Sequence, residues 1–196
     1  MPHSPGAATR RARDATATRA AILAAARARF AQDSYERVGV REIAADAGVN
    51  AALVIRYFGS KQQLFAAAIA QDLGLTELLA GDLDGLGEGI VRHFLHQWDA
   101  GTALNPLLIL LHSAANRQAA EEVHQSLTAQ FVEPLARRMP GDEALLRATL
   151  IGAHLLGLAI MRNVLQSEPL ASSAVERLVA LVAPAVQSYL DGSAEL

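Results

Sequence analysis

Three side chains that could bond a polar or charged partner stand close together at Arg56, Tyr57 and Lys61. A guanidinium can donate two parallel hydrogen bonds to the edge of a guanine base. Tyrosine and lysine side chains suit the phosphate oxygens of a nucleic acid backbone. The neighbouring Val54 and Phe58 are apolar and can point back into a small core, which leaves the three polar residues for a partner.

The stretch around these residues, 40–61, predicts two short helices joined by a tight turn. Ile43, Ala44 and Ala47 place apolar side chains on one narrow helical face. Gly48 can end that helix because glycine adopts positive φ without steric cost. Asn50 is a favourable N-cap for a second helix starting at residue 51. Two helices at such a corner form a helix-turn-helix, whose second helix fits the major groove of DNA.

Three motifs extend this pattern: ILAAARARF at 22–30, VREIAADAGV at 40–49 and RYFGSKQQLF at 56–65. In their order and spacing, residues 18–68 closely resemble the N-terminal domain of the TetR (tetracycline-repressor-like) family of transcriptional regulators. The resemblance implies that one set of residues faces DNA, namely Arg41, Asn50, Ala51, Ala52, Ile55, Arg56, Tyr57 and Lys61.

This set of residues has few polar side chains for reading bases. The alanines and Ile55 offer only apolar contact, most usefully to a thymine methyl group. We therefore expect base specificity to depend heavily on Arg56, with DNA shape supplying more. The family pattern also has Ser or Thr where this chain has Gly39, which puts one common phosphate contact in doubt.

The charge of the chain is unevenly distributed. The 196 residues carry a net charge of −3. Residues 1–65 hold ten Arg and Lys against five Asp and Glu, about +5, whereas residues 66–196 hold seven against fifteen, about −8. A basic first third on an acidic remainder is typical of a DNA-binding domain attached to a domain with another role.

Composition narrows the other possibilities. The chain has no cysteine, which excludes disulfides and thiolate metal sites and fits a cytoplasmic protein. Its longest apolar region, 144–165, is interrupted by Arg147, His154 and Arg162, so we expect no membrane partner. Phosphate-cradling glycine motifs, nucleophile elbows and HExxH runs are absent from the sequence. We therefore expect a protein that is not an enzyme and that holds no metal or cofactor.

The helical periodicity predicts an all-α fold of about nine helices in three parts. Residues 1–15 are expected to be a flexible basic arm that either follows phosphates or is a solvated tail. Residues 16–73 form the DNA-binding domain, including a fourth helix that acts as a strut and starts from a capping box at Ser60 and Gln63. Residues 74–196 form a helical domain for ligand binding and dimerisation. The five glycines within 74–89 favour a boundary there.

Two expected helices, at about 142–166 and 173–190, are apolar around most of their circumference. A helix of this kind is buried on all sides, either by a partner subunit or as a central core helix of a monomer. The family resemblance implies that the two helices pair across a two-fold axis. The expected dimer interface consists of Leu150, Leu155, Leu158, Arg162, Val179, Val182 and Val186.

Polar and aromatic residues in the second domain could line a largely apolar ligand pocket. They are His93, Phe94, Trp98, His112, Asn116, Phe131 and His154. Alternatively, each histidine is a half-exposed group with its own hydrogen bond. The paired histidines at 93 and 96 lack nearby ligands to complete a metal site.

The leading hypothesis is a homodimeric transcriptional repressor, released from a palindromic operator by a small, mainly apolar effector. One alternative is an all-helical small-molecule-binding protein or enzyme in which the helix-turn-helix is only structural. Another is an interaction module that dimerises through its last two helices.

Overall fold

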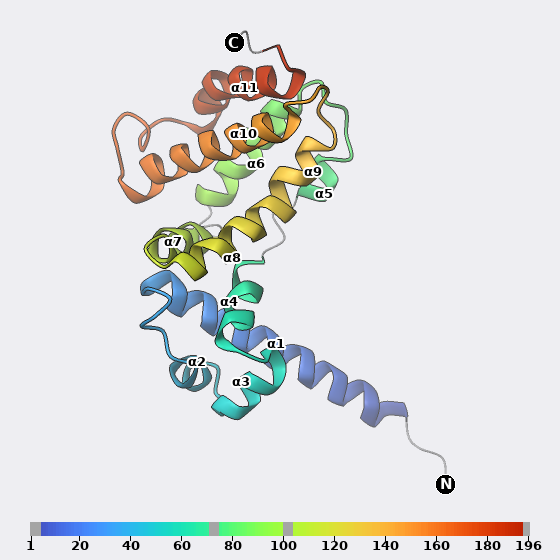
Figure 1. Cartoon of the computed structure of the whole chain (residues 1–196), viewed down its shortest axis with the longest axis vertical. Helices are drawn as coiled ribbons and strands as arrows, with labels where there is room; N and C mark the ends of the chain where they lie inside the picture. Colours follow the sequence, from blue (N-terminus) through green and yellow to red (C-terminus); the bar gives the residue numbers. More distant parts are fainter. Residues whose placement is uncertain (1–4, 71–74, 100–103, 194–196) are drawn as a thin grey trace. The chain divides into compact units, whose positions relative to one another are not determined.

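The computed structural model describes residues 5–70, 75–99 and 104–193, and all regular elements within these ranges are helices (Figure 1). The all-α prediction is confirmed. The chain divides into two compact units. We call Met1–Gln71 with Leu108–Val123 the head unit, and Asp72–Leu107 with His124–Leu196 the body unit. The first division lies near the boundary expected at 73/74, but the head unit also contains a later segment.

The head unit contains α1 (Pro5–Gln32), α2 (Val40–Asp46), α3 (Ala51–Phe58) and α4 (Lys61–Ile69). Helix α1 begins at Pro5, well before the expected start near Thr16, so residues of the expected flexible arm are helical. Alanine and arginine, which dominate this segment, favour helix, and proline is tolerated in a first turn. The side chains of Arg10, Arg11 and Arg13 lie outside the described residues.

The core of the head unit forms where α1 meets the three helices that follow it. Ile22, Ala26 and Phe30 are a buried stripe on α1, at the predicted i, i+4, i+8 spacing. The ring of Phe30 meets that of Phe65 edge-on, with 4.9 Å between centroids. Tyr35 lies edge-on to Phe65 at 5.1 Å, so one aromatic group joins α1, the α1–α2 connection and α4.

Two further helices complete this core. Helix α7 (Leu104–Ser113) and helix α8 (Arg117–Leu127) supply Ile109, Ala119 and Val123, each buried with the N-terminal residues. A three-helix or four-helix head predicted from residues 16–73 alone is therefore incomplete. Apolar periodicity marks a face as buried but does not identify which distant helix covers it.

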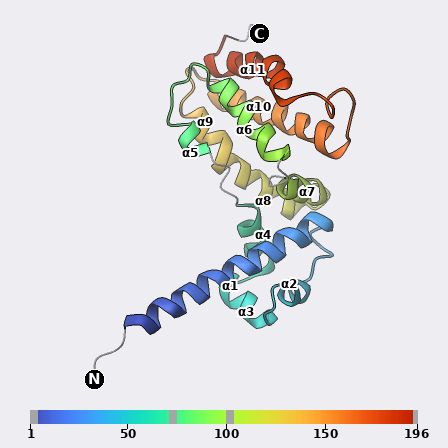
Figure 2. The same ribbon diagram turned by 180° about the vertical axis from the view of Figure 1, so that it is seen from behind.

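The body unit contains α5 (Leu75–Leu78), α6 (Leu86–Asp99), α9 (Glu133–Ala136), α10 (Ala144–Ala159) and α11 (Val175–Asp191). Single π-helical turns occupy Thr128–Val132, before α9, and Ile160–Val164, after α10. Helices α6, α10 and α11 lie side by side in both views (Figure 1, Figure 2). Their facing apolar residues, with Phe131 and Leu135, form the core of this unit.

Helix α6 starts at Leu86, so part of the glycine-rich stretch predicted as a boundary is helical. Glycine is needed at position 87 inside this helix because a Cβ there would lie 2.8 Å from the backbone nitrogen of Gln187 on α11. The Gly87 N–H donates to Oε1 of Gln187 over 2.8 Å. The glycine thus permits a close approach of two helices rather than a flexible link.

Candidate nucleic-acid interface

The corner between α2 and α3 has the local geometry expected of a helix-turn-helix. Gly48 adopts a φ of +66°, and the N–H of Val49 donates to the Ala44 carbonyl over 2.9 Å, which turns the chain. The Asn50 side chain then accepts from the N–H of Leu53 over 2.8 Å and caps α3. Ser60 caps α4 in the same way, accepting from the N–H of Gln63 over 3.1 Å.

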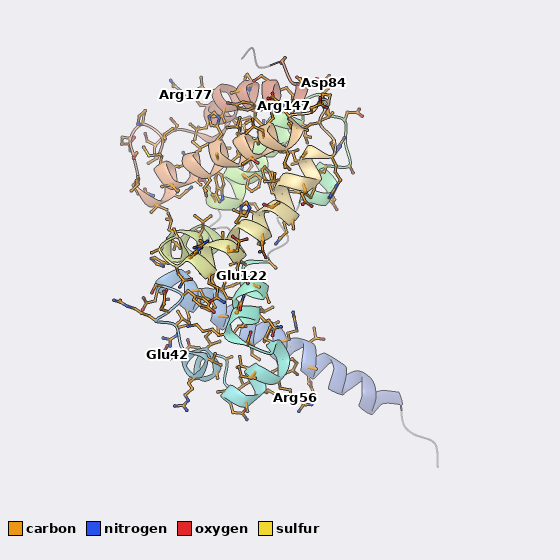
Figure 3. The ribbon with its side chains drawn as sticks, in the orientation of Figure 1. Glu42, Arg56, Asp84, Glu122, Arg147 and Arg177 are labelled. Atoms are coloured by element: carbon orange, nitrogen blue, oxygen red, sulfur yellow. The ribbon has the colours of Figure 1, made fainter. Side chains whose placement is uncertain are left out.

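Helix α3 has a buried face and an outer face. Val54 and Phe58 are buried at 1 % and 8 % exposure and hold the helix on the core. Ala52, Ile55 and Arg56 are exposed. Arg56 is labelled in Figure 3. Ile55 keeps 42 % of its surface accessible, so an apolar side chain on this outer face is free to meet a partner.

The remaining residues that are predicted to face DNA differ in the exposure of their side chains and in the hydrogen bonds that these already make. Arg41 is exposed on α2, near its start. Ala51 and Tyr57 are half-buried, and Asn50 is exposed but its side-chain oxygen is already used as the cap of α3. The structure thus places Arg41 and Arg56 as exposed basic side chains on the two helices of the corner.

Lys61, expected to reach phosphate, lies against the head unit itself. Its ammonium donates to the Glu36 carbonyl oxygen over 3.3 Å and stands 4.5 Å from the centre of the Tyr35 ring. Burial lowers the pKa of Lys61, and the charge of Glu36 opposes that shift. A phosphate contact by Lys61 therefore requires the ammonium to leave these two residues.

Arginines on α1 contribute contacts that sequence reasoning did not identify. The Arg19 guanidinium lies 5.0 Å from the centre of the Phe58 ring, over the buried face of α3. Arg29 forms a two-bond pair with Asp46 at the end of α2, and Arg27 donates to the Ala68 carbonyl over 2.9 Å. The only sequence signal was their spacing on a basic helix, which does not name a partner.

The residues expected to line one ligand pocket are only partly brought together. Phe94 of α6 lies at the centre of an aromatic group, with His93, Trp98 and Phe131 at centroid distances of 5.6, 5.5 and 5.7 Å. We call these four side chains the aromatic group of the body unit. The described hollows of the body unit, about 450 and 360 Å³, are lined by other residues.

The other three expected pocket residues lie elsewhere. His112 and Asn116 belong to the head unit, where Asn116 caps α8 by accepting from the N–H of Ala119 over 2.7 Å. His154 is exposed on α10, away from the body core. Helical spacing predicted that these polar residues face the interior of the ligand-binding domain. In the structure, His112 and Asn116 lie in the head unit and His154 faces solvent.

Most residues expected at a dimer interface are buried within the chain's own body unit. Leu155, Leu158, Val179 and Val186 are between 0 and 8 % exposed and pack with α6 and each other. Within one chain these four side chains are already covered by its own helices, and their place at a dimer interface stays a prediction. Only Leu150, at 39 %, is exposed, and Val182 is half-buried.

Arg162, also expected at the interface, is buried at 8 % exposure. Its Nε and Nη2 atoms bond the two carboxylate oxygens of Asp99 over 3.1 and 3.0 Å. Its Nη1 atom donates to the carbonyl oxygens of Leu170 and Ser173. The guanidinium thus bonds the distant Asp99 and two carbonyl oxygens of the loop that follows it in the chain, all within one chain.

The exposed apolar residues of α10 and the following turn form a different set. They are Leu145, Leu146, Leu150, Met161 and Leu165, and α11 adds Leu181 at 69 % exposure. The helical segment Ala144–Val164 is long and apolar enough to cross a membrane. However, its other side forms part of the body core, and Arg147 and Arg162 within it bond neighbouring segments, as in a core helix.

Comparison with known proteins matches two segments of the chain to one family. Residues 22–68 match the family model described as bacterial regulatory proteins of the tetR family, and residues 84–190 match the tetracyclin repressor-like C-terminal domain. No curated protein matches the sequence.

A solved TetR-family regulator from Streptomyces coelicolor A3 is 33 % identical, with a TM-score of 0.64 over 89 % of this chain and 95 % of that one. FadR of Bacillus subtilis, solved with stearoyl-CoA, is 18 % identical, with a TM-score of 0.62 over 88 % of this chain and 97 % of its own. NalD of Pseudomonas aeruginosa is 23 % identical, with a TM-score of 0.54 over 84 % of this chain and 94 % of its own. The last two similarities concern the fold alone. The two family models and the Streptomyces relative show that this chain belongs to the TetR family of bacterial transcriptional regulators.

Proposed function

We propose that the protein is a cytoplasmic, homodimeric repressor that binds a palindromic operator through residues 41–61 of each subunit. A small, mainly apolar effector bound by the body unit releases the operator. The observation that carries the DNA-binding part is the two-sided burial of α3: Val54 and Phe58 fix the helix, and Ile55 and Arg56 face outward. A short helix with a fixed inner face and an exposed outer face can enter the major groove.

The exposed arginines of the head unit suit two kinds of contact with DNA, one to a base and one to a phosphate. Arg56 on α3 is suited to a guanine edge, and Arg41 on α2 is suited to a phosphate. The net charge of about +5 over residues 1–65 supports binding to the DNA backbone. Ile55 adds apolar contact where a thymine methyl group is present.

The exposed apolar side chains of α10 and α11 support pairing of two subunits. Leu146, Leu150 and Leu181 keep 55, 39 and 69 % of their surfaces accessible within one chain. Large apolar side chains gathered on neighbouring helices are typical of a subunit interface. A dimer presents two copies of α3, which can read successive major grooves on one face of the duplex.

The aromatic group supports an apolar effector site in the body unit. Phe94 and Trp98 are half-buried beside the buried Phe131, so an apolar molecule can extend an existing cluster. The similar FadR structure contains stearoyl-CoA, and NalD is named as a repressor of a multidrug efflux pump. An effector releases DNA only if it binds the released conformation more tightly than the DNA-bound one.

Replacing Arg56 by Ala should weaken binding to a duplex selected by the wild-type protein by about 5- to 150-fold, the cost of one bidentate base contact. Binding is measured by fluorescence anisotropy at one fixed salt concentration. Arg177→Ala, which removes an exposed arginine from α11 of the body unit, is the matched control and should change little (Figure 3). Equal effects of the two substitutions would show that α3 does not read DNA.

Replacing Leu150 and Leu181 together by Glu should separate the subunits, because each Glu would place a charge in the apolar interface. Light scattering should then give a mass near that of one chain, 20.7 kDa, instead of about twice that mass. Leu127→Glu changes a residue of similar exposure on α8 and should leave the dimer intact. A wild-type protein that ran as a monomer would contradict the dimer outright.

Trp98 is the only tryptophan of the chain, so its fluorescence reports on the aromatic group. Acyl-CoA thioesters and apolar antibiotics should be tested first for release of DNA in a gel shift. Any compound that releases DNA should change the Trp98 emission over the same concentration range, and Phe131→Leu should shift both curves to higher concentration. Release of DNA with unchanged emission would place the effector elsewhere.

A further inference from the structure

The later segment of the head unit, Leu108–Val123, contacts Glu36 and Gln62, the residues that bond Lys61 and follow it in the chain. Asn116, at the corner between α7 and α8, donates from its amide nitrogen to the Glu36 carboxylate. Glu122, on α8, accepts from the amide of Gln62 over 2.6 Å. Gln62 follows Lys61 directly, and the carbonyl of Glu36 is the hydrogen-bond acceptor for the Lys61 ammonium. These polar contacts are additional to the apolar burial of Ile109, Ala119 and Val123.

Glu36 bonds Lys61 and Asn116 through two different groups. Its backbone carbonyl accepts from the ammonium of Lys61 over 3.3 Å, and its side-chain carboxylate accepts from Asn116. The hydrogen bond from Asn116 is the largest cause that lowers the pKa of Glu36, and the charge of Lys61 acts in the same direction. A glutamate carboxylate is in any case charged at neutral pH. Glu36 thus carries both the carbonyl oxygen that accepts from Lys61 and a negatively charged carboxylate, and the carboxylate is bonded to the amide of Asn116.

The orientation of the Asn116 amide is determined by the cap of α8. Its oxygen accepts from the N–H of Ala119 over 2.7 Å, which leaves the amide nitrogen to face Glu36. The start of α8 therefore aims a donor at the carboxylate. If α8 began elsewhere, or if the α7–α8 corner moved, this donor would be withdrawn.

We propose that Asn116 is a positioning residue for DNA binding: by bonding the Glu36 carboxylate, it prevents that charge from pairing with Lys61, and so leaves the ammonium available to a DNA phosphate. In the structure, the ammonium donates to a carbonyl oxygen and lies over the face of Tyr35. The Glu36 carboxylate acts on it through its charge, without a direct hydrogen bond among the described contacts. The carbonyl and the ring carry no net charge, so a phosphate replaces them more readily than it replaces a carboxylate, whose opposite charge adds a Coulomb attraction to the hydrogen bond.

This inference rests on the proposed DNA-binding function and adds a route for its regulation. A shift of the α7–α8 corner that breaks the Asn116–Glu36 bond frees the carboxylate to capture Lys61. DNA affinity then falls without any change in α3. The corner therefore acts on the phosphate contact rather than on base reading.

The test is a double-mutant cycle with the duplex that the wild-type protein selects from a random DNA pool. Asn116→Ser retains a cap for α8, since serine is a good N-cap, but its side chain is too short to bond Glu36. It should weaken binding by about two- to fivefold at low salt, the range of one exposed ion pair. In the Lys61→Ala background the same substitution should have no effect. Glu36→Gln should restore affinity to Asn116→Ser, because no carboxylate then competes for Lys61.

Loss of affinity that persists in the Lys61→Ala background, or that Glu36→Gln does not restore, would overturn the proposal and show that Asn116 only stabilises the fold. Purely additive effects would overturn it as well. The proposed DNA-binding function fails separately, if Arg56→Ala leaves binding of the same duplex unchanged. Circular dichroism of Asn116→Ser at each binding temperature checks that α8 remains folded.

Discussion

The burial of one face of α3 is the constraint on which the rest of this structure depends. A helix of eight residues is too short to be stable alone in water. It is held by Val54 and Phe58, which enter a core built from α1, α2, α4 and the later segment Leu108–Val123. Because the inner face is occupied by these contacts, the outer face is free to present Ile55 and Arg56. The head unit can therefore be understood as a support for two turns of helix.

That support also explains why the basic residues of α1 are not all available to DNA. Arg27 and Arg29 bond the ends of α4 and α2, and Arg19 covers the ring of Phe58. Their charges contribute to the positive field of the head unit, but their contacts are structural. Relatively few free polar side chains remain for the DNA binding expected of this family, so we expect phosphate contacts and DNA shape to supply much of the affinity and selectivity.

Local features of the head were predictable from the sequence because their causes lie within three or four residues. The positive φ of Gly48 and the caps at Asn50 and Ser60 each follow from one residue type at one position. The sequence says less about distant partners. Leu155 and Leu150 look alike in the sequence, yet one lies in the body core and the other in solvent. The sequence does not reveal the carboxylate partner of Arg162, because Asp99 lies 63 residues away in the chain. The role of residues 108–123 in the head was missed for the same reason.

We propose above all that two copies of α3, held at a fixed separation, read one DNA duplex. Selection of bound sequences from a random DNA pool tests it most directly, since the enriched motif reports symmetry and spacing together. A dimer that holds two copies of α3 at a fixed separation should enrich an inverted repeat whose half-sites are centred about 10–10.5 base pairs apart, one helical turn, or a multiple of that distance. Enrichment of a single unrepeated site, or no enrichment at low salt, would contradict it.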